Sequence, residues 1–480
     1  MTHVFRVLGV STALALTVAC ATIDSTPDAP AVTESDRATA ARSHPQILAQ
    51  FGGAVEGPLA TYVAAVGERT AVAAGVPNSC TFSVVNSDVP NAFAIPGCYI
   101  YVTRGLLAIM NSEDELASVL GHEVGHVVAD HSARRQNTAT LTSLGALLAG
   151  IAAGSGDIAQ LAGQAAQIYT LSYSRDQEYE SDDLGGRYLI ANGYNAYAAA
   201  DMLQALGTND ALNARISNRT ASATPTWARS HPLSADRVAR ATGRASAAGA
   251  LRDTPPERVA PYFAAIRGMI WGDDPEQGFV NGRTFAHPIM RIAFDAPEGF
   301  SLTNTPAAVQ IGGQNGRAIF SGGALQGTLE AYATNVLRQT IGQARSEVGR
   351  ASTSSTNGLE TVTIPARVQN QQGQILDLQV VAYRVGDRAY HFVTLAPSGG
   401  SAVFAQMLGS MRQLSTQQAS ALRARQIEIV DVRSGDTPAR LAQRMAFTDY
   451  QLDRFLALNG LEQGATLRAG QQVKIITYVR

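Results

Sequence analysis

Lysine, cysteine and long apolar runs are scarce in this 480-residue chain. The net charge is −2, so the chain lacks the basic surplus that a nucleic-acid partner requires. After the first twenty residues, no apolar run is long enough to span a bilayer. The three cysteines show no C-x-x-C spacing, which argues against a cysteine-ligated zinc site. What remains is an ordinary globular composition and a length that predicts about two to four domains.

Residues 112–131 read SEDELASVLGHEVGHVVADH and contain an H-E-x-x-H pattern. Ser112 and Glu115 predict a capped helix start, and apolar residues then recur at helical spacing. His122 and His126 lie four positions apart, so two imidazoles on one helix face can point at one ion. Glu123 can reach a water bound to that ion. This pattern suits a zinc hydrolase; the alternative is a helix with two surface histidines and a glutamate.

The first residues have the features of an export signal. Arg6 supplies a charged start, residues 7–18 an apolar core, and residues 17–19 a small-residue cleavage site. Residues 1–19 are therefore predicted to be a signal peptide. Cys20 follows directly, which resembles a bacterial lipoprotein signal whose cysteine is lipidated. Thr17 stands where leucine is usual, so ordinary cleavage nearby is the alternative.

The residues directly after Cys20 indicate to which membrane the chain would be attached. Ala21 and Thr22, which follow the cysteine directly, are not the aspartate that typically retains lipoproteins at the inner membrane, so the resemblance implies the periplasmic face of an outer membrane. The lipid would be the chain's membrane attachment. Residues 20–45 are rich in Ala, Thr, Pro and Ser and predict a flexible tether.

Residues 46–75 predict a helix, followed by two short β-rich runs at Thr81–Asn86 and Tyr99–Thr103. Cys80 and Cys98 each stand just ahead of one run. If Cys20 carries lipid, these two cysteines form an even pair in an oxidising compartment, which favours a disulfide. The alternative is two buried free thiols.

Small and apolar residues over 139–153 and 158–171 predict a helical hairpin against the H-E-x-x-H helix, with a lid or membrane-touching role as the alternative. Beyond it, a second helix runs to Asn192-Gly193. A catalytic zinc takes three protein ligands and keeps one open position. Glu178 on this helix is the best third ligand, and Asp182, one turn later, can accept the free N–H of a ligand histidine. Taken alone, both would be solvated surface charges.

Four motifs in order resemble the HtpX and CaaX-prenyl-protease family of zinc metallopeptidases, in its periplasmic BepA-type branch. They are Asn91-Ala-Phe-Ala-Ile-Pro-Gly97, His122 to His126, Glu178-Tyr-Glu-Ser-Asp182, and His231-Pro232 with Arg237. Cys98 and Ser181 depart from the family pattern, and neither is a metal ligand. The resemblance implies a mainly helical, gluzincin-type domain with a small sheet over residues 46–250. It implies one Zn²⁺ per chain on His122, His126 and Glu178, with Glu123 as catalytic base and Asp182 as support.

The same resemblance implies further site residues. The stretch Asn91, Ala92, Phe93 and Ala94 resembles an edge strand along which these enzymes pair an extended substrate. His231 and Arg237 resemble a catalytic pair over the zinc. His231 either steadies the oxyanion or occupies the open zinc position as a latch. From its residues alone, His231-Pro232 would be a loop turn.

The second half of the chain divides into three parts. Residues 251–285 predict a linker. Residues 286–416 hold two rounds of three strands and a helix, which predict an α+β domain of antiparallel sheet whose order resembles a PsbP-like fold; with no titratable cluster, a structural or binding role is expected. Residues 425–480 resemble a LysM module, through motifs such as residues 432–437 and 458–461, which implies a βααβ fold and peptidoglycan binding. Glycan-facing aromatics are sparse, so a purely structural role is the alternative.

The chain is thus predicted to be an α+β multidomain, zinc-dependent endopeptidase of the bacterial cell envelope. Its expected substrates are misfolded or stalled envelope proteins, and its expected place is the periplasm at the outer membrane. Two alternatives are an envelope-protein assembly chaperone with latched protease activity and a peptidoglycan-binding anchor.

Overall fold

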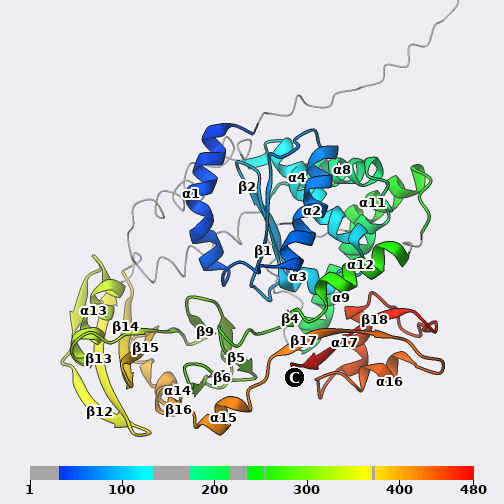
Figure 1. Ribbon diagram of the computed structural model, residues 1–480. Coiled ribbons are helices and arrows are strands. Elements are labelled where there is room, and N and C mark those ends of the chain that lie inside the picture. Colours follow the sequence, from blue (N-terminus) through cyan, green and yellow to red (C-terminus); the bar gives the residue numbers. More distant parts are fainter. Residues whose placement is uncertain are drawn as a thin grey trace, which may run out of the picture.

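The computed structural model describes residues 32–132, 173–216, 231, 235–252, 256–369 and 373–479. Cys20, the start of the predicted tether, the predicted hairpin and Pro232 lie outside these ranges. None of the helices within them is long and apolar enough to cross a membrane. Figure 1 shows a helical lobe at the top, a β-rich domain at lower left and a small C-terminal module at lower right.

The helical lobe packs helices on both faces of a three-stranded sheet of order β1-β3-β2. β1 and β3 are parallel, and β2 is an antiparallel edge strand. Strand side chains alternate between faces, so one face meets α1 and the other meets α2 and α4. The elements are α1 (Glu34–Gln50), α2 (Pro58–Ala73), β1 (Thr81–Val85), β2 (Ala92–Ile95), β3 (Tyr99–Thr103), α3 (Arg104–Ile109), α4 (Glu113–Val128), α8 (Arg175–Ala191), α9 (Ala198–Ile216), α11 (Ala235–Ala247) and α12 (Pro256–Ile266).

Helix α1 contradicts the predicted tether over residues 34–45. The Thr33 side chain caps its start by accepting the N–H of Asp36. The alanine content read as low complexity also favours helix, and Ile47 anchors the far end in an aromatic cluster beside the sheet. The helix predicted for 46–75 is also wrong in part, because the chain leaves helical geometry at Phe51 and re-enters it only at Pro58.

Helices α4 and α8 approach each other closely through glycines. A Cβ placed on Gly185 of α8 would lie 3.0 Å from the backbone nitrogen of His122, and one on Gly125 would lie 3.2 Å from the Ser181 carbonyl oxygen. Side chains larger than hydrogen would therefore push the two helices apart. This contact places the H-E-x-x-H helix and the Glu178 helix within ligand distance of one ion.

The start of α4 differs in one detail from its prediction. Ser112 is the N-cap and accepts the N–H of Glu115, as expected. The Glu115 carboxylate, however, accepts the N–H of Asn111 at 2.9 Å rather than that of Ser112. A complete capping box is found instead on α8, between Ser174 and Gln177.

The accessory domain consists of antiparallel sheets, as predicted. An eight-stranded sheet of order β11-β13-β14-β15-β10-β9-β8, with β12 added on β13, lies beside a four-stranded sheet of order β16-β7-β6-β5. Helix α13 packs against one face of the eight-stranded sheet, and an aromatic cluster that includes Phe320 and Phe392 packs against the other face. The sequence predicted six strands here, and β8, β11 and β12, none of which has a buried residue, are among those that it missed. The elements are β5 (Phe279–Asn281), β6 (Thr284–His287), β7 (Ile292–Asp295), β8 (Ser301–Asn304), β9 (Val309–Gly313), β10 (Gly316–Ala324), α13 (Leu329–Ile341), β11 (Ser346–Val348), β12 (Ser352–Thr356), β13 (Leu359–Gln369), β14 (Ile375–Val385), β15 (Arg388–Pro397), η1 (Ser401–Phe404), α14 (Ala405–Ser410) and β16 (Arg412–Gln413).

The predicted linker at 251–285 is instead packed structure. Helix α12 buries Tyr262, Phe263 and Ile266 in the core of the helical lobe. β4 (Ile270–Trp271) pairs with the first strand of the C-terminal module, and β5 belongs to the accessory sheet. A short helical piece was expected within the linker, but its packing into the core of the lobe depends on contacts with residues far away in the chain.

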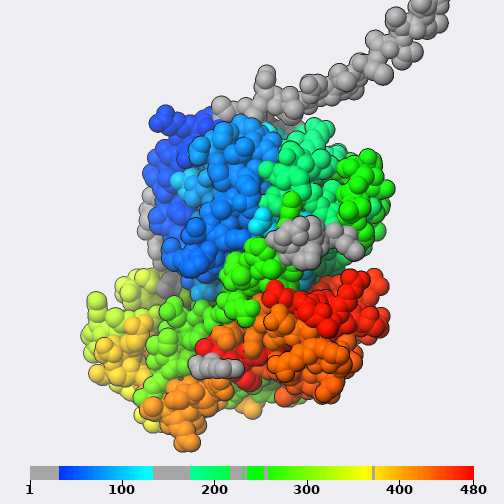
Figure 2. Space-filling model, turned by 45° about the vertical axis from the view of Figure 1, so that its right-hand side comes forward, coloured from blue at the N-terminus to red at the C-terminus, as the bar shows by residue number. Residues whose placement is uncertain are grey.

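The C-terminal module has the predicted βααβ order, and its core is continuous with that of the helical lobe. It comprises β17 (Arg425–Asp431), α16 (Pro438–Ala442), α17 (Gln451–Leu458) and β18 (Gln472–Tyr478), after the short α15 (Thr416–Ser420). Lys474, the single lysine of the chain, is fully buried at the contact. Its Nζ donates to the carbonyls of Ala108 and Met110 at 2.7 and 2.6 Å. Figure 2 shows the module, in orange and red, seated against the lobe.

Candidate metal centre

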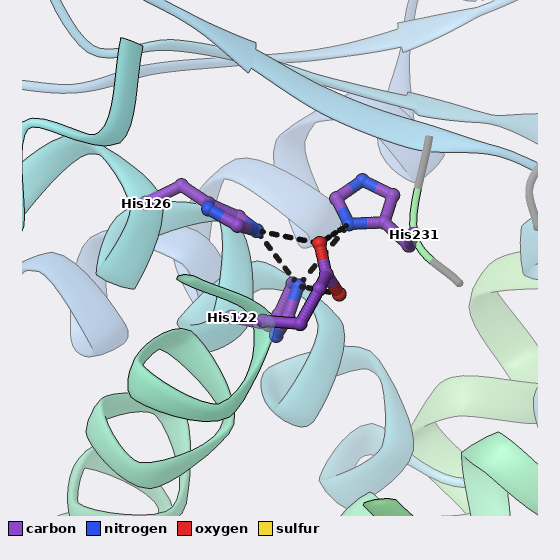
Figure 3. A group of neighbouring side chains, drawn as sticks. His122, His126 and His231 are labelled. Carbon is purple, nitrogen blue, oxygen red and sulfur yellow. Dashed lines mark hydrogen bonds and ion pairs between the residues drawn. The ribbon is translucent and has the colours of Figure 1, made fainter. Parts of the chain in front are cut away.

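Four side chains bring their ligand atoms within 4.8 Å of one another: His122, His126, Glu178 and His231. The Nε2 atoms of His122 and His126 are 3.0 Å apart. Glu178 Oε1 lies 3.6 Å from His126 Nε2 and 2.9 Å from His231 Nδ1. Figure 3 shows the three imidazoles converging on the same space. The structure thus places the three predicted ligands together and adds His231 as a fourth donor.

The donor set fits a divalent metal. An ion held tetrahedrally by bonds of about 2.0–2.1 Å separates its donors by roughly 3.3–3.4 Å. Five of the six residue pairs in the cluster have donor atoms 2.9–3.6 Å apart. The pKa of Glu178 lies well below its usual range: burial raises it, but His231 and the other two histidines outweigh that effect. Burial lowers the pKa of His126. An ionised carboxylate and a neutral imidazole are the forms that bind metal.

Arg237 and Asp182 hold these ligands in place. Asp182 Oδ1 lies 3.0 Å from His122 Nδ1, which directs the other ring nitrogen of His122 into the cluster. Arg237 forms two hydrogen bonds to Asp182, at 2.7 and 2.8 Å, and an ion pair with Glu178 at 2.8 Å. Burial raises the pKa of Asp182, but Arg237 and His122 together bring it below its usual range. Arg237 thus contacts both carboxylates directly.

Glu123 lies beside the cluster without taking part in it. Its carboxylate is buried, and Oε2 has no hydrogen-bond partner among the described residues. Burial raises its pKa, which strengthens a carboxylate as a proton acceptor near neutral pH. Oε1 lies 3.6 Å from His231 Nε2.

Two contacts behind His126 were not anticipated. His126 Nδ1 lies 2.8 Å from His131 Nδ1, and His131 Nε2 lies 3.1 Å from Glu180 Oε2. The Tyr173 ring stacks on His126 with centroids 3.7 Å apart. His131 lies beyond the end of α4, after Asp130 in a left-handed conformation, so helical spacing could not place it. Its five-residue separation from His126 was the only sequence signal.

The four residues of the predicted substrate strand face two different sides of the sheet. Asn91 and Ala92 line a cavity beside the cluster, and Ala94 lines a second hollow that reaches His126. Phe93 points to the opposite face, where its ring lies 4.8 Å from that of Tyr101. β2 can therefore meet a substrate through its backbone and three of these four residues, while Phe93 anchors it.

Cys80 and Cys98 form a disulfide, which decides between the two alternatives that the sequence left open. The bond ties the start of β1 to the turn between β2 and β3. It thereby braces the edge strand next to the metal cluster.

Comparison with known proteins agrees with this geometry. Residues 59–245 match the sequence model of Peptidase family M48, and residues 430–475 match that of the LysM domain. The M48 match spans the whole ligand set and both helices that carry it.

Residues 59–245 are a Peptidase M48 domain.

Named relatives share mainly this M48 domain. The chain is 34% identical over 231 residues to the beta-barrel assembly-enhancing protease of Yersinia pestis, covering 45% of each chain. It is 32% identical over 203 residues to the protein of that name in Escherichia coli (strain K12), covering 40% of each. The mitochondrial metalloendopeptidase OMA1 of Schizosaccharomyces pombe is 29% identical over 187 residues, which are 38% of this chain and 51% of that one. The chain therefore spans less than half the length of the first two relatives.

Among solved structures, cyanobacterial PsbP from Synechocystis covers 28% of this chain and 98% of its own, at 11% identity and a TM-score of 0.24. A score this low assigns no fold, so the PsbP-like order of the accessory domain stays a prediction. With the M48 domain, the LysM domain and mixed helix and strand content, the chain is multidomain.

Proposed function

We propose that the protein is a zinc-dependent endopeptidase whose M48 domain holds one Zn²⁺ on His122, His126 and Glu178. The observation that carries this proposal is the convergence of these three donors within 4.8 Å, with the buried Glu123 carboxylate beside them. Bound Zn²⁺ would lower the pKa of a water molecule and polarise a peptide carbonyl. The nitrogen and oxygen donors suit zinc, and the ligand set is that of a gluzincin.

The chain's own residues then have separate tasks. Glu123 accepts a proton from the attacking water and delivers it to the leaving amine. Asp182 and Arg237 keep the side chains of His122 and Glu178 oriented. Among the described residues β2 is an edge strand of its sheet, and an extended peptide can add there as a further strand.

His231 supports a second candidate function. Its Nδ1 lies 2.9 Å from Glu178 Oε1 and 3.3 Å from His122 Nε2, in the position that a catalytic zinc keeps open. This placement favours the latch over the oxyanion role in the resting protein. A latched site suits an assembly chaperone whose protease activity is released on demand. His231 would then leave the cluster before a substrate carbonyl enters.

We also propose that the substrates are misfolded or stalled envelope proteins and that the protein works in the periplasm, anchored by lipid at Cys20. The disulfide supports an oxidising compartment, and the names of the relatives support a role near outer-membrane assembly. The LysM domain supports contact with peptidoglycan.

The variant Glu123→Gln tests the catalytic proposal, because it keeps the shape of the side chain and removes the proton acceptor. We expect about one zinc per chain in both proteins and a fall in proteolysis of an unfolded substrate of at least about 10²-fold. Metal content is measured on purified protein, and cleavage on a casein-type substrate. Equal cleavage by both proteins would refute the proposal.

His231→Ala separates the two candidates. Release of a latch predicts faster cleavage than in the wild-type protein, whereas loss of an oxyanion donor predicts cleavage that is slower by about 10²-fold or more. Glu123→Gln in the same background must abolish either activity.

A further inference from the structure

We propose that the accessory domain binds a fatty acid, with the acyl chain in an apolar cavity between α13 and the eight-stranded sheet and the carboxylate at its mouth. The cavity has a free volume of about 220 Å³. It belongs to a hydrophobic core separate from the one that contains the metal-binding helix. The proposal therefore does not depend on the endopeptidase function.

The floor of the cavity follows from the register of three neighbouring strands. Opposite residues of an antiparallel pair, and residues two apart on one strand, point to the same face. Leu395 of β15 lies opposite Leu378 of β14, and Val393 of β15 lies opposite Ile319 of β10. These four side chains line the cavity, and Val336 in the second half of α13 faces them. Because α13 packs mainly on β13 and β14, it covers the β10 side of this face incompletely.

The polar groups in the wall are already engaged or neutral. The Thr340 hydroxyl donates to the Val336 carbonyl within α13. His391 Nδ1 lies 2.9 Å from the Tyr332 hydroxyl, and burial lowers the pKa of His391 to about 4, so this ring is neutral near pH 7. An apolar cavity of roughly 150 Å³ stays dry and binds benzene. The larger cavity here suits a single flexible chain of several carbon atoms.

The backbone around the cavity favours an acyl chain over a peptide. Its strand residues lie on β14, β15 and β10, which are interior strands in the order β13-β14-β15-β10-β9. Their N–H and C=O groups are engaged in the sheet on both sides. A peptide entering the cavity would bury its own amide groups without partners, which is costly, whereas an acyl chain carries no such groups.

The mouth of the cavity carries a free positive charge. Arg317 of β10 is exposed, lines the cavity, and makes no hydrogen bond or ion pair within the part of the chain that the structure describes. Gln339, exposed on α13, lines it as well and has an amide N–H to donate. No acidic side chain is among the described residues that line the cavity. An apolar interior with a cation at its entrance matches an acyl chain that ends in a carboxylate.

The first experiment measures binding of butanoate, hexanoate and octanoate to the full chain by calorimetry, below the concentrations at which they form micelles. Each added methylene group should raise the affinity about fourfold until the cavity is filled. Octanoate should also increase hydrogen-exchange protection in α13, β10 and β15. Octanoate binding no tighter than butanoate, or protection elsewhere only, would overturn the proposal without bearing on proteolysis.

Ile319→Trp tests the location of the site, because the half-buried Ile319 side chain lies on the cavity floor and a larger ring there fills the space. Octanoate affinity should fall at least about tenfold. Thr303→Trp is the matched control: Thr303 is exposed on the same sheet face, in the same cross-strand row, but outside the cavity. Equal octanoate binding by wild-type protein and Ile319→Trp would place the ligand elsewhere and overturn the proposal.

Arg317→Gln tests the head group. Octanoate affinity should fall roughly three- to fivefold, as expected for an exposed ion pair, while the affinity for uncharged 1-octanol should not change. Arg338→Gln is the control, because Arg338 is exposed in the last turn of α13 and does not line the cavity. An unchanged octanoate affinity in Arg317→Gln would overturn the carboxylate at the mouth, and the fatty acid with it.

A competition experiment distinguishes the acyl chain from an extended peptide. A blocked peptide of alternating valine and threonine should neither bind in the cavity nor displace octanoate. Displacement of octanoate by this peptide, lost in Ile319→Trp, would replace the fatty acid by a peptide ligand and overturn the proposal.

Discussion

The C-terminal module and the accessory domain relate to the M48 domain in opposite ways. The module lies far from the M48 domain in sequence, yet both contribute to one hydrophobic core that includes Val124 of α4 and Phe455 of α17. The accessory domain lies between them in sequence and keeps separate cores around Phe392 and Val380. Distance along the chain therefore says little about which parts share stability.

The difference has a consequence for function. A LysM domain that shares its core with the metal-binding helix cannot be a freely tethered anchor. A glycan or partner that binds the module would act on a body that includes α4, whereas a ligand of the accessory domain would not. Four predictions test this contrast, beginning with the largest effect.

Phe455→Ala and Phe392→Ala are a matched pair, because both rings are fully buried, one in each region. Each substitution should cost about 3–5 kcal/mol of local unfolding free energy. Phe455→Ala should reduce hydrogen-exchange protection in α2 and α4 as well as in the module. Phe392→Ala should reduce it only in the accessory sheets. Unchanged protection of α4 in Phe455→Ala would show that the module folds by itself.

Lys474→Ala should weaken the contact between the module and the M48 domain. Burial lowers the pKa of Lys474 and raises that of Glu115, and each group partly offsets the shift of the other. Removing the lysine leaves the buried carbonyls of Ala108 and Met110 without their donor, at a cost of about 1–3 kcal/mol for each unsatisfied group. Denaturant unfolding should show the loss in the transition of the shared core. Lys474→Met keeps the packing volume but also removes the ammonium group, so it should lose somewhat less stability than Lys474→Ala. Wild-type stability in Lys474→Met would exclude the electrostatic explanation and assign the loss in Lys474→Ala to packing.

Acid should destabilise the accessory domain through His391. Burial lowers the pKa of this histidine to about 4, and its Nδ1 lies 2.9 Å from the Tyr332 hydroxyl. Because the folded pKa lies below the unfolded value of about 6.5, this stabilising contribution is present above pH 6.5 and is lost as the pH falls through about 4. The loss is about 3 kcal/mol. Urea titrations near pH 7 and pH 4, read by hydrogen-exchange labelling of β14 and β15, measure it.

The control for this prediction is His391→Gln, which keeps a hydrogen-bonding group and does not titrate. Its stability should change less with pH than that of the wild-type protein. The same acid loss in both proteins would assign the effect to other groups.

His131→Ala should have the smallest effect on stability and a local effect on the metal. Because His131 contacts the ring nitrogen of His126 that faces away from the cluster, its loss should lower zinc affinity by about 10–100-fold. Competition with a chelator measures this change. Denaturant unfolding of the accessory domain should be unaffected. If the zinc affinity were unchanged, His131 would have only a packing role.

The candidate site was predictable where its signals are local. Helical spacing places His122 and His126 on one face, and the need for a third ligand points to Glu178 on the next capped helix. His231 and Arg237 were found only by family resemblance, because a loop histidine has no spacing rule. His131 was missed although it lies in the same stretch. The α+β content also followed from periodicity, and the βααβ order followed from the resemblance to a LysM module. Helix α1 was missed because its composition resembles that of a tether, and the stretch that holds α12 was assigned to a linker.

The sequence by itself predicted the metal chemistry of this protein, since residue type and a period of 3.6 are enough to aim two imidazoles at one point and to supply candidate carboxylates. Tertiary structure alone decided four other features: the approach of Glu178 through the packing of α8 on α4, the place of His231 in the cluster, the cavity beside it, and the burial of the single lysine between two domains. These features depend on contacts between residues far apart in the chain. Such contacts arise from packing and desolvation, which no local pattern records.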